Sequence, residues 1–137
     1  MTIRRLLFVC VENSCRSQMA EAFARLDGGE GVEAHSAGSR ASGVVNPGAI
    51  RTMAKLGYDL SSHASKTPAD LPAGNFDVVV SMGCGDACPA VPAGRREDWD
   101  VPDPKALGED GFRAVRDEIR ARVRTLLASL GVEFRAS

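Results

Sequence analysis

A cysteine and an arginine separated by five residues are the clearest chemical signal in this sequence. Cys10 and Arg16 flank the segment Val11-Glu12-Asn13-Ser14-Cys15, and Ser17 follows directly. A loop of this length can curl so that successive backbone N–H groups point to its centre. A helix starting at its end adds unpaired N–H donors and the positive end of the helix dipole. Because the planar Arg16 guanidinium also suits a tetrahedral oxyanion, we expect residues 11–17 to bind one.

The same positive field acts on the sulfur of Cys10. An ordinary cysteine is mostly protonated at neutral pH, and only its thiolate is a strong nucleophile. The loop N–H groups and Arg16 favour the thiolate, and the Ser17 hydroxyl can donate a hydrogen bond to it. Cys10 is therefore our candidate nucleophile. The alternative is an inert cysteine at a strand end, with Arg16 on a solvated helix face. The position of the segment between a predicted strand and a predicted helix favours the nucleophile.

Strand and helix patterns alternate along the chain. Uninterrupted apolar runs predict buried parallel strands, and apolar residues at helical spacing predict amphipathic helices. The ranges expected as strands are 6–9, 32–37 and 76–80. The ranges expected as helices are 17–26, 47–57 and 112–130. Residues 81–110 are rich in Gly, Pro and Asp and are expected mostly as loop. The alternation predicts one α/β domain over residues 1–137, with a parallel sheet that binds its ligand beyond the carboxyl ends of the strands.

Composition narrows the classes of partner. With 137 residues, 44% hydrophobic content and a net charge of −1, the chain fits one globular domain with no sign of a nucleic-acid or anionic-membrane partner. No apolar run reaches the roughly 18 residues of a membrane span, and the run at 6–9 is too short for a signal peptide. We expect a cytoplasmic protein, in which four cysteines point to chemistry rather than to a disulfide scaffold.

A second cysteine pair follows the predicted strand 76–80. Cys84 and Cys88 lie in a segment with glycine and aspartate neighbours, on the side of the sheet where Cys10 is expected. Zinc binding together with Cys10 and Cys15 is one alternative, but the spacings resemble no common zinc site. Passive packing in the core is another, and the polar neighbours argue against it. We therefore expect no metal and a redox role for the pair.

The segment from Cys10 to Ser17 resembles the phosphate-binding loop of the low-molecular-weight protein tyrosine phosphatase superfamily. The longer string from Asn13 to Glu21 is similar to its arsenate reductase branch. The resemblance spans the chain, and its further segments are Ser36-Ala37-Gly38, Asn46-Pro47, Ser61 to Ser65, the second cysteine segment, Asp103-Pro104 and Arg116 to Ile119. It implies a single-domain four-stranded parallel sheet flanked by helices.

The resemblance also implies a reaction. Cys10 attacks arsenate, Cys84 attacks Cys10 and releases arsenite, and Cys88 then attacks Cys84. The resulting disulfide is reduced by thioredoxin, with no bound cofactor. Cys84 and Cys88 are separated by fewer residues than in the thioredoxin-coupled pattern. A low-molecular-weight thiol, in place of thioredoxin, is therefore an alternative final reductant.

Further residues receive roles from the same resemblance. Asp103 is the candidate general acid, with Asp98 and Asp100 as neighbouring alternatives. The residues expected to support the loop are Asn13, Ser17, Glu21, Ser36 and Lys66. Some relatives bind potassium with an aspartate where Lys66 stands, so we expect the lysine to pair with Glu21 and to replace the ion. Cys15 is expected to pack behind the loop, and Glu12 to point to solvent.

The main rival function is a low-molecular-weight phosphotyrosine phosphatase that uses Cys10, Arg16 and Asp103. The resemblance argues against it, because such phosphatases carry proline where Gln18 stands and an aromatic residue where Lys105 stands. A non-catalytic anion or thiol sensor is a third interpretation. His35 and His63 have no spacing suited to a metal and are expected as capping or surface residues, and Trp99 is expected to pack.

Overall fold

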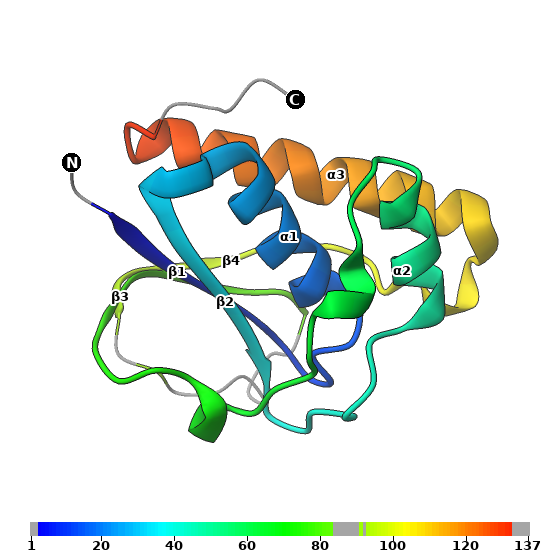
Figure 1. The fold of residues 1–137 in the computed structure, drawn as a ribbon, viewed down its shortest axis with the longest axis horizontal. Helices are drawn as coiled ribbons and strands as arrows, with labels where there is room; N and C mark the ends of the chain where they lie inside the picture. The colour runs from blue at the N-terminus through cyan, green and yellow to red at the C-terminus, as the bar shows by residue number, and fades with distance from the viewer. Residues whose placement is uncertain (1–2, 84–90, 92, 133–137) are drawn as a thin grey trace.

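The structure is a computed structural model that describes residues 3–83, 91 and 93–132. Its sheet has four parallel strands in the order β2-β1-β3-β4 (Figure 1). The strands are β1 (Arg4–Cys10), β2 (Val32–Gly38), β3 (Phe76–Ser81) and β4 (Ala93–Asp98). The α-helices are α1 (Arg16–Gly28), α2 (Pro47–Ala54) and α3 (Gly108–Ser129). The predicted four-stranded parallel sheet flanked by helices is confirmed.

Strand β1 is central because its apolar run is buried on both faces. Leu6 and Phe8 face a core that contains residues of all three α-helices. Leu7 and Val9 face a smaller core with Ala37, Phe76 and Val79. This alternation is the period of two that an extended strand imposes on its side chains, and it places Cys10 at the carboxyl end of the most enclosed strand.

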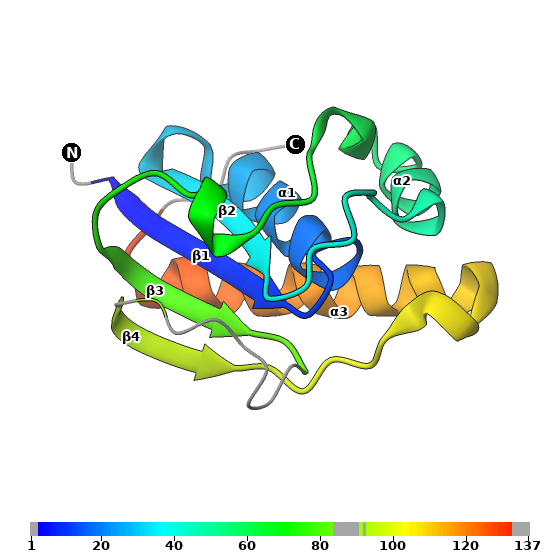
Figure 2. The same ribbon diagram turned by 90° about the horizontal axis from the view of Figure 1, so that it is seen from below.

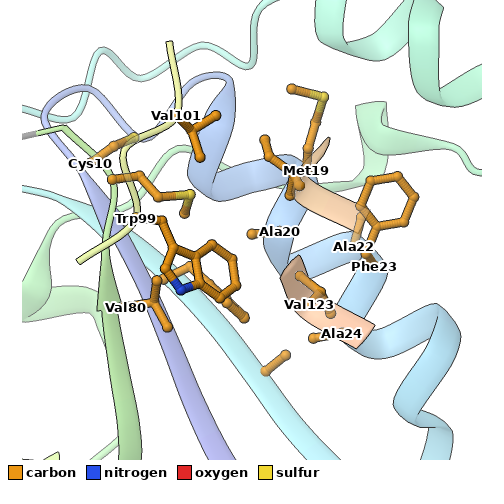
Figure 3. Close-up of a cluster of buried hydrophobic side chains, with 14 of the residues drawn as sticks. Cys10, Met19, Ala20, Ala22, Phe23, Ala24, Val80, Trp99, Val101 and Val123 are labelled. Carbon is orange, nitrogen blue, oxygen red and sulfur yellow. The ribbon is translucent and has the colours of Figure 1, made fainter. Parts of the chain in front are cut away.

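The larger core connects the helices to the sheet behind the site. Figure 3 shows Cys10, Val80, Trp99 and Val101 together on the sheet side of this core, opposite Met19, Phe23 and Val123 from the helices. Trp99 is buried and its ring lies 5.9 Å from that of Phe8, so the expected packing role is confirmed.

Helices α1 and α3 are also joined by charge. The buried carboxylate of Asp27 on α1 accepts bonds from Arg120 at 2.9 Å and Arg124 at 3.1 Å on α3. These contacts hold the helix that starts beside Cys10 against the rest of the domain.

One prediction of local structure is wrong. Residues 93–98, expected within a loop, form β4, which lies at the edge of the sheet beside β3 (Figure 2). Its sequence, Ala-Gly-Arg-Arg-Glu-Asp, is mostly exposed and has no apolar alternation. An edge strand of this kind is held by backbone pairing rather than by side-chain burial, so its pattern carries little strand signal. None of the helices in the described ranges is long and apolar enough to cross a membrane.

Candidate active site

The loop between β1 and α1 turns its carbonyl groups outward. Four consecutive carbonyl oxygens accept hydrogen bonds from outside the loop. The pairs are Arg40 N to Val11 O, Ser42 N to Glu12 O, Gln18 Nε2 to Asn13 O and Asn46 N to Ser14 O, at 2.8–3.0 Å. Because a trans peptide directs its C=O and N–H oppositely, the N–H groups of residues 12–15 turn toward the loop interior. Successive inward N–H groups have the form of an anion-binding cradle.

Two backbone positions permit this curl. Asn13 adopts a left-handed conformation with φ of 49°, which asparagine tolerates better than most residues. Gly38, at the end of β2, lies directly against the loop, where a Cβ would be 2.5 Å from Val11 O and 2.8 Å from Asn13 N. Only glycine therefore lets the loop lie this close to the sheet.

The buried Cys10 sulfur lies at the base of the loop, with a hydroxyl directed at it. Ser17 Oγ is 2.9 Å from Cys10 Sγ, and Asn13 Nδ2 donates to the same Oγ at 2.9 Å. Since the serine oxygen accepts from the amide, its own hydrogen is available to the sulfur. This arrangement favours a negative charge on Cys10.

A pocket of about 270 Å³ opens above this sulfur. It is lined by Cys10, Val11, Glu12, Ser14, Cys15, Arg16, Asp103 and Lys105. The structure therefore brings the expected nucleophile, arginine and acid to one cavity, at the carboxyl end of β1. A pocket of this size has room for a small tetrahedral anion.

Arg16 and Asp103 face each other in this pocket. Arg16 Nη1 donates to Val101 O at 3.0 Å, and its Nη2 lies 3.9 Å from Asp103 Oδ2. Asp103 Oδ1 accepts from Lys105 N at 3.1 Å, which caps the short turn Pro104–Ala106. The backbone of residues 101–105 thus holds the acid and the guanidinium beside the nucleophile.

Glu12 is exposed to solvent, as expected, and it also forms an ion pair that the sequence did not predict. Its side chain is 48% exposed, and Lys105 Nζ lies 2.8 Å from its Oε2. The ammonium offsets the negative charge that a glutamate brings to an anion-binding loop. Both residues line the pocket, so this ion pair forms part of its wall.

Cys15 lies in the same pocket but in a different environment. It is buried in the larger core, and burial, with smaller contributions from Asp103 and Cys10, raises the pKa of its thiol to about 12. A thiol with this pKa stays protonated and unreactive near neutral pH. Its position is in line with the packing role expected for it.

A buried carboxylate supports the loop from behind. Glu21 Oε1 accepts from Ser36 Oγ at 2.5 Å and lies 3.4 Å from Lys66 Nζ, and its Oε2 lies 2.9 Å from Arg25. The expected pairing of Lys66 with Glu21 is present. The backbone N–H of Lys66 also donates to Asn13 Oδ1 at 2.7 Å, so this lysine contacts the loop itself. Within the described ranges, no three His, Cys, Asp or Glu side chains gather as a metal site.

One buried side chain beside the loop, that of His63, was not among the predicted site residues. His63, expected at a cap or on the surface, has a side chain only 2% exposed, and its Nδ1 lies 3.0 Å from Gln18 Oε1. Forty-five positions separate the two residues in the chain, so no local spacing could have indicated this contact.

Cys84 and Cys88 lie outside the described residues. Gly83, which is bonded to Cys84, has φ of +74°, and a Cβ on it would lie 2.5 Å from Arg16 Nη1. The chain that leads into the second cysteine pair therefore passes directly beside the arginine of the pocket.

Comparison with known proteins identifies the family. Residues 5–136 match the low molecular weight phosphotyrosine protein phosphatase family. The chain belongs to this family. The resemblance inferred from the sequence is therefore confirmed.

Several proteins similar to this chain are arsenate reductases. The glutaredoxin arsenate reductase of Synechocystis is 38% identical over 131 residues, covering 93% of this chain and 99% of that protein. A solved arsenate reductase in the phosphate-binding state is 37% identical with a TM-score of 0.82, covering 93% of this chain and 98% of that one. A thioredoxin-dependent arsenate reductase from Corynebacterium glutamicum is 32% identical with a TM-score of 0.75, covering 95% of this chain and 63% of that one.

Proposed function

We propose that this chain reduces arsenate to arsenite with Cys10 as the nucleophile. The observation that carries the proposal is the position of Cys10 Sγ, which lies beside the Ser17 hydroxyl at the base of a pocket lined by Arg16 and Asp103. Relatives that share about two-fifths of its residues over nearly its whole length are arsenate reductases. One structural relative was solved in a phosphate-binding state, and phosphate has the shape and charge of arsenate.

In the first step, the Cys10 thiolate attacks arsenic(V). An S–As bond forms and an As–O bond breaks, while Asp103 donates a proton so that the oxygen leaves as water. Arg16 and the inward N–H groups of residues 12–15 hold the remaining oxygens, where negative charge builds up. The product is a covalent adduct in which Cys10 Sγ is bonded to arsenic. Arsenic still has its original oxidation state, As(V).

In the second step, electrons pass from the cysteine sulfurs to arsenic. The Cys84 thiolate attacks Cys10 Sγ, the S–As bond breaks and its electron pair stays on arsenic. Arsenic is thereby reduced from As(V) to As(III) and leaves as arsenite, while the two sulfurs are oxidised to a disulfide. Support for this step comes from Gly83, the residue before Cys84, because a Cβ built on it would lie 2.5 Å from Nη1 of the pocket arginine.

Cys88 then completes the relay in our proposal. Its thiolate attacks Cys84, which frees Cys10 and leaves a Cys84–Cys88 disulfide for an external dithiol to reduce. The thioredoxin-dependent relative favours thioredoxin as that reductant, and the glutaredoxin arsenate reductase favours glutaredoxin. Of the two, we propose thioredoxin as the reductant. Because the relay consumes thiols at every turnover, it needs a reducing compartment, which agrees with the expected cytoplasmic location.

The rival phosphatase activity would use the same Cys10, Arg16 and Asp103 on a phosphate ester. The Glu12–Lys105 ion pair argues against it as the main activity, because it puts two charged side chains where an aryl group would have to pack. We expect only slow hydrolysis of p-nitrophenyl phosphate.

Arsenate turnover tests the proposal directly. It is measured once with thioredoxin, thioredoxin reductase and NADPH, and once with glutaredoxin and glutathione. Cys10→Ser and Cys84→Ser should abolish turnover, Cys88→Ser should abolish it with thioredoxin, and Cys15→Ser should retain most of it. Turnover that survives in Cys10→Ser, or is lost only in Cys15→Ser, would contradict the assignment of roles.

A further inference from the structure

A line of hydrogen bonds runs from the candidate nucleophile to Tyr58, in the segment that follows α2. It crosses the loop and the first turns of α1. Its links are Cys10 Sγ to Ser17 Oγ at 2.9 Å, Ser17 Oγ to Asn13 Nδ2 at 2.9 Å, Asn13 Oδ1 to Gln18 Nε2 at 3.0 Å, Gln18 Oε1 to His63 Nδ1 at 3.0 Å and His63 Nε2 to Tyr58 Oη at 2.6 Å.

The backbone sets the direction of the two amide links. Gln18 Nε2 lies 3.0 Å from Asn13 O and 2.8 Å from Ala64 O, and a carbonyl oxygen can only accept, so this atom is the NH₂ group. Asn13 Oδ1 accepts the backbone N–H of Lys66 at 2.7 Å, so this atom is the carbonyl oxygen. The two hydrogens of Gln18 Nε2 serve three acceptors, so one goes to Ala64 O and the other is shared between Asn13 O and Asn13 Oδ1. Gln18 therefore donates to Asn13, and Asn13 donates to Ser17.

The orientation of Gln18 in turn sets the tautomer of His63. Gln18 Oε1 is an acceptor, and Glu21 Oε2, a second acceptor, lies 3.4 Å from the same Nδ1. His63 Nδ1 must therefore carry a hydrogen. In the neutral ring Nε2 then holds a lone pair, which accepts the hydroxyl hydrogen of Tyr58.

The environment keeps both groups in these protonation states. Burial lowers the pKa of His63 and raises the pKa of Tyr58, so the ring is neutral and the phenol protonated at neutral pH. The charged groups that act on His63 are Glu21, Arg25, Lys66 and Asp59. Arg25 and Lys66 pair with Glu21, which limits the pull of that carboxylate on a second proton.

We propose that His63 and Tyr58 are positioning residues that hold the Gln18–Asn13–Ser17 chain with every donor directed toward the Cys10 sulfur. Tyr58 donates to His63, His63 to Gln18, Gln18 to Asn13, Asn13 to Ser17 and Ser17 to the thiolate. Each donation polarises the next, and the last one stabilises the negative charge on sulfur. This inference rests on the proposed nucleophilic role of Cys10 and adds two residues that do not touch the pocket.

The test measures how readily Cys10 is alkylated as a function of pH. Iodoacetamide is added to the full chain, and the alkylated Cys10 peptide is quantified by mass spectrometry, which gives the pH midpoint of reactivity. His63→Leu keeps a side chain of similar bulk without a donor. His63→Asn is the matched control, because its Nδ2 occupies the place of the histidine Nδ1 and can still donate to Gln18.

We expect the midpoint to rise by about half a pH unit in His63→Leu and to rise less in Tyr58→Phe. His63→Asn keeps the donation to Gln18 but loses the Nε2 that accepts from Tyr58, so its midpoint should rise no more than that of Tyr58→Phe. Thermal melting of each variant shows that it is folded. If His63→Leu does not fold, Tyr58→Phe, which removes only one oxygen atom, carries the test.

An unchanged midpoint in folded His63→Leu, or an equal rise in His63→Asn, would overturn the proposal, because the histidine would then act only by filling space. An unchanged midpoint in Tyr58→Phe would overturn the part assigned to the tyrosine. The alkylation midpoint does not depend on arsenate. If only the proposed reductase activity is wrong, arsenate turnover will be absent while the alkylation midpoints of the variants still differ as expected.

Discussion

Ser17 Oγ lies within hydrogen-bond distance of Cys10 Sγ, at the first turn of the helix that follows the loop. Ser17→Ala removes the only side-chain donor that the described residues direct at this sulfur. A hydrogen bond to a charged group contributes about 1.5–3 kcal/mol, so we expect the pH midpoint of Cys10 alkylation to rise by about one to two units. Ser62→Ala, which removes an exposed hydroxyl that does not line the pocket, is the control and should leave the midpoint unchanged.

Cys15 should behave as an inert thiol. Its pKa, raised to about 12 by burial, keeps it protonated while the thiol of an unfolded chain ionises near pH 9. The folded state therefore holds the proton more tightly, and the free energy of unfolding should fall as pH rises above about 9. Urea denaturation measures this free energy of unfolding. Between pH 8 and pH 10 we expect it to fall less in Cys15→Ser than in the unsubstituted protein. An identical loss in both proteins would contradict the raised pKa.

Asp103→Asn tests the general acid. The amide keeps the cap on the turn Pro104–Ala106 but cannot give up a proton to the leaving oxygen. We expect single-turnover reduction of arsenate to slow by about 10²–10⁴-fold, with phosphate affinity, measured by calorimetry, within a few-fold of the original. Asp100→Asn is the matched control, since Asp100 does not line the pocket. A normal rate in Asp103→Asn and a slow one in Asp100→Asn would move the acid to Asp100.

Gly83→Ala should weaken oxyanion binding through Arg16. The added Cβ would lie 2.5 Å from Nη1, so the guanidinium has to move away from its place in the pocket. Gly57→Ala is the matched control, because Gly57 also has positive φ but nothing lies within 4 Å of its Cβ position. Both variants should lose about 1 kcal/mol of stability from left-handed strain. Only Gly83→Ala should raise the phosphate dissociation constant, by about tenfold. Equal affinities in the two variants would show that Arg16 does not hold the anion.

Because of Lys66, the protein should need no potassium for its stability or its turnover. Its ammonium lies 3.4 Å from Glu21 Oε1, where it supplies positive charge to a buried carboxylate. We expect the melting temperature and turnover to be the same in potassium and sodium chloride. Lys66→Asp places a second carboxylate beside Glu21, so its melting temperature should rise with added potassium. A large potassium effect on the unsubstituted protein would contradict this role.

The elements that bury apolar side chains could be predicted from sequence, because burial repeats with the period of the element. The run Leu6 to Val9 predicts β1, and the apolar positions from Phe112 to Leu127 predict α3, both of which the structure confirms. The spacing of Cys10 and Arg16 predicts the loop because all its residues are contiguous. The sequence of strand β4 has no apolar pattern that would predict a strand. An exposed edge strand is held by backbone hydrogen bonds, which do not depend on the types of its side chains.

The contacts that complete the site depend on tertiary structure. His63 meets Gln18 only because the segment after α2 crosses the first turns of α1, and Lys105 meets Glu12 only because the chain after β4 returns to the pocket. Such pairs join residues far apart in the chain, and they meet only once the segments that connect the helices and strands have packed against one another. The sequence by itself therefore determined the family and predicted the candidate nucleophile and its loop. Only the tertiary structure decided which distant side chains lie around that cysteine, because no local period encodes a long-range contact.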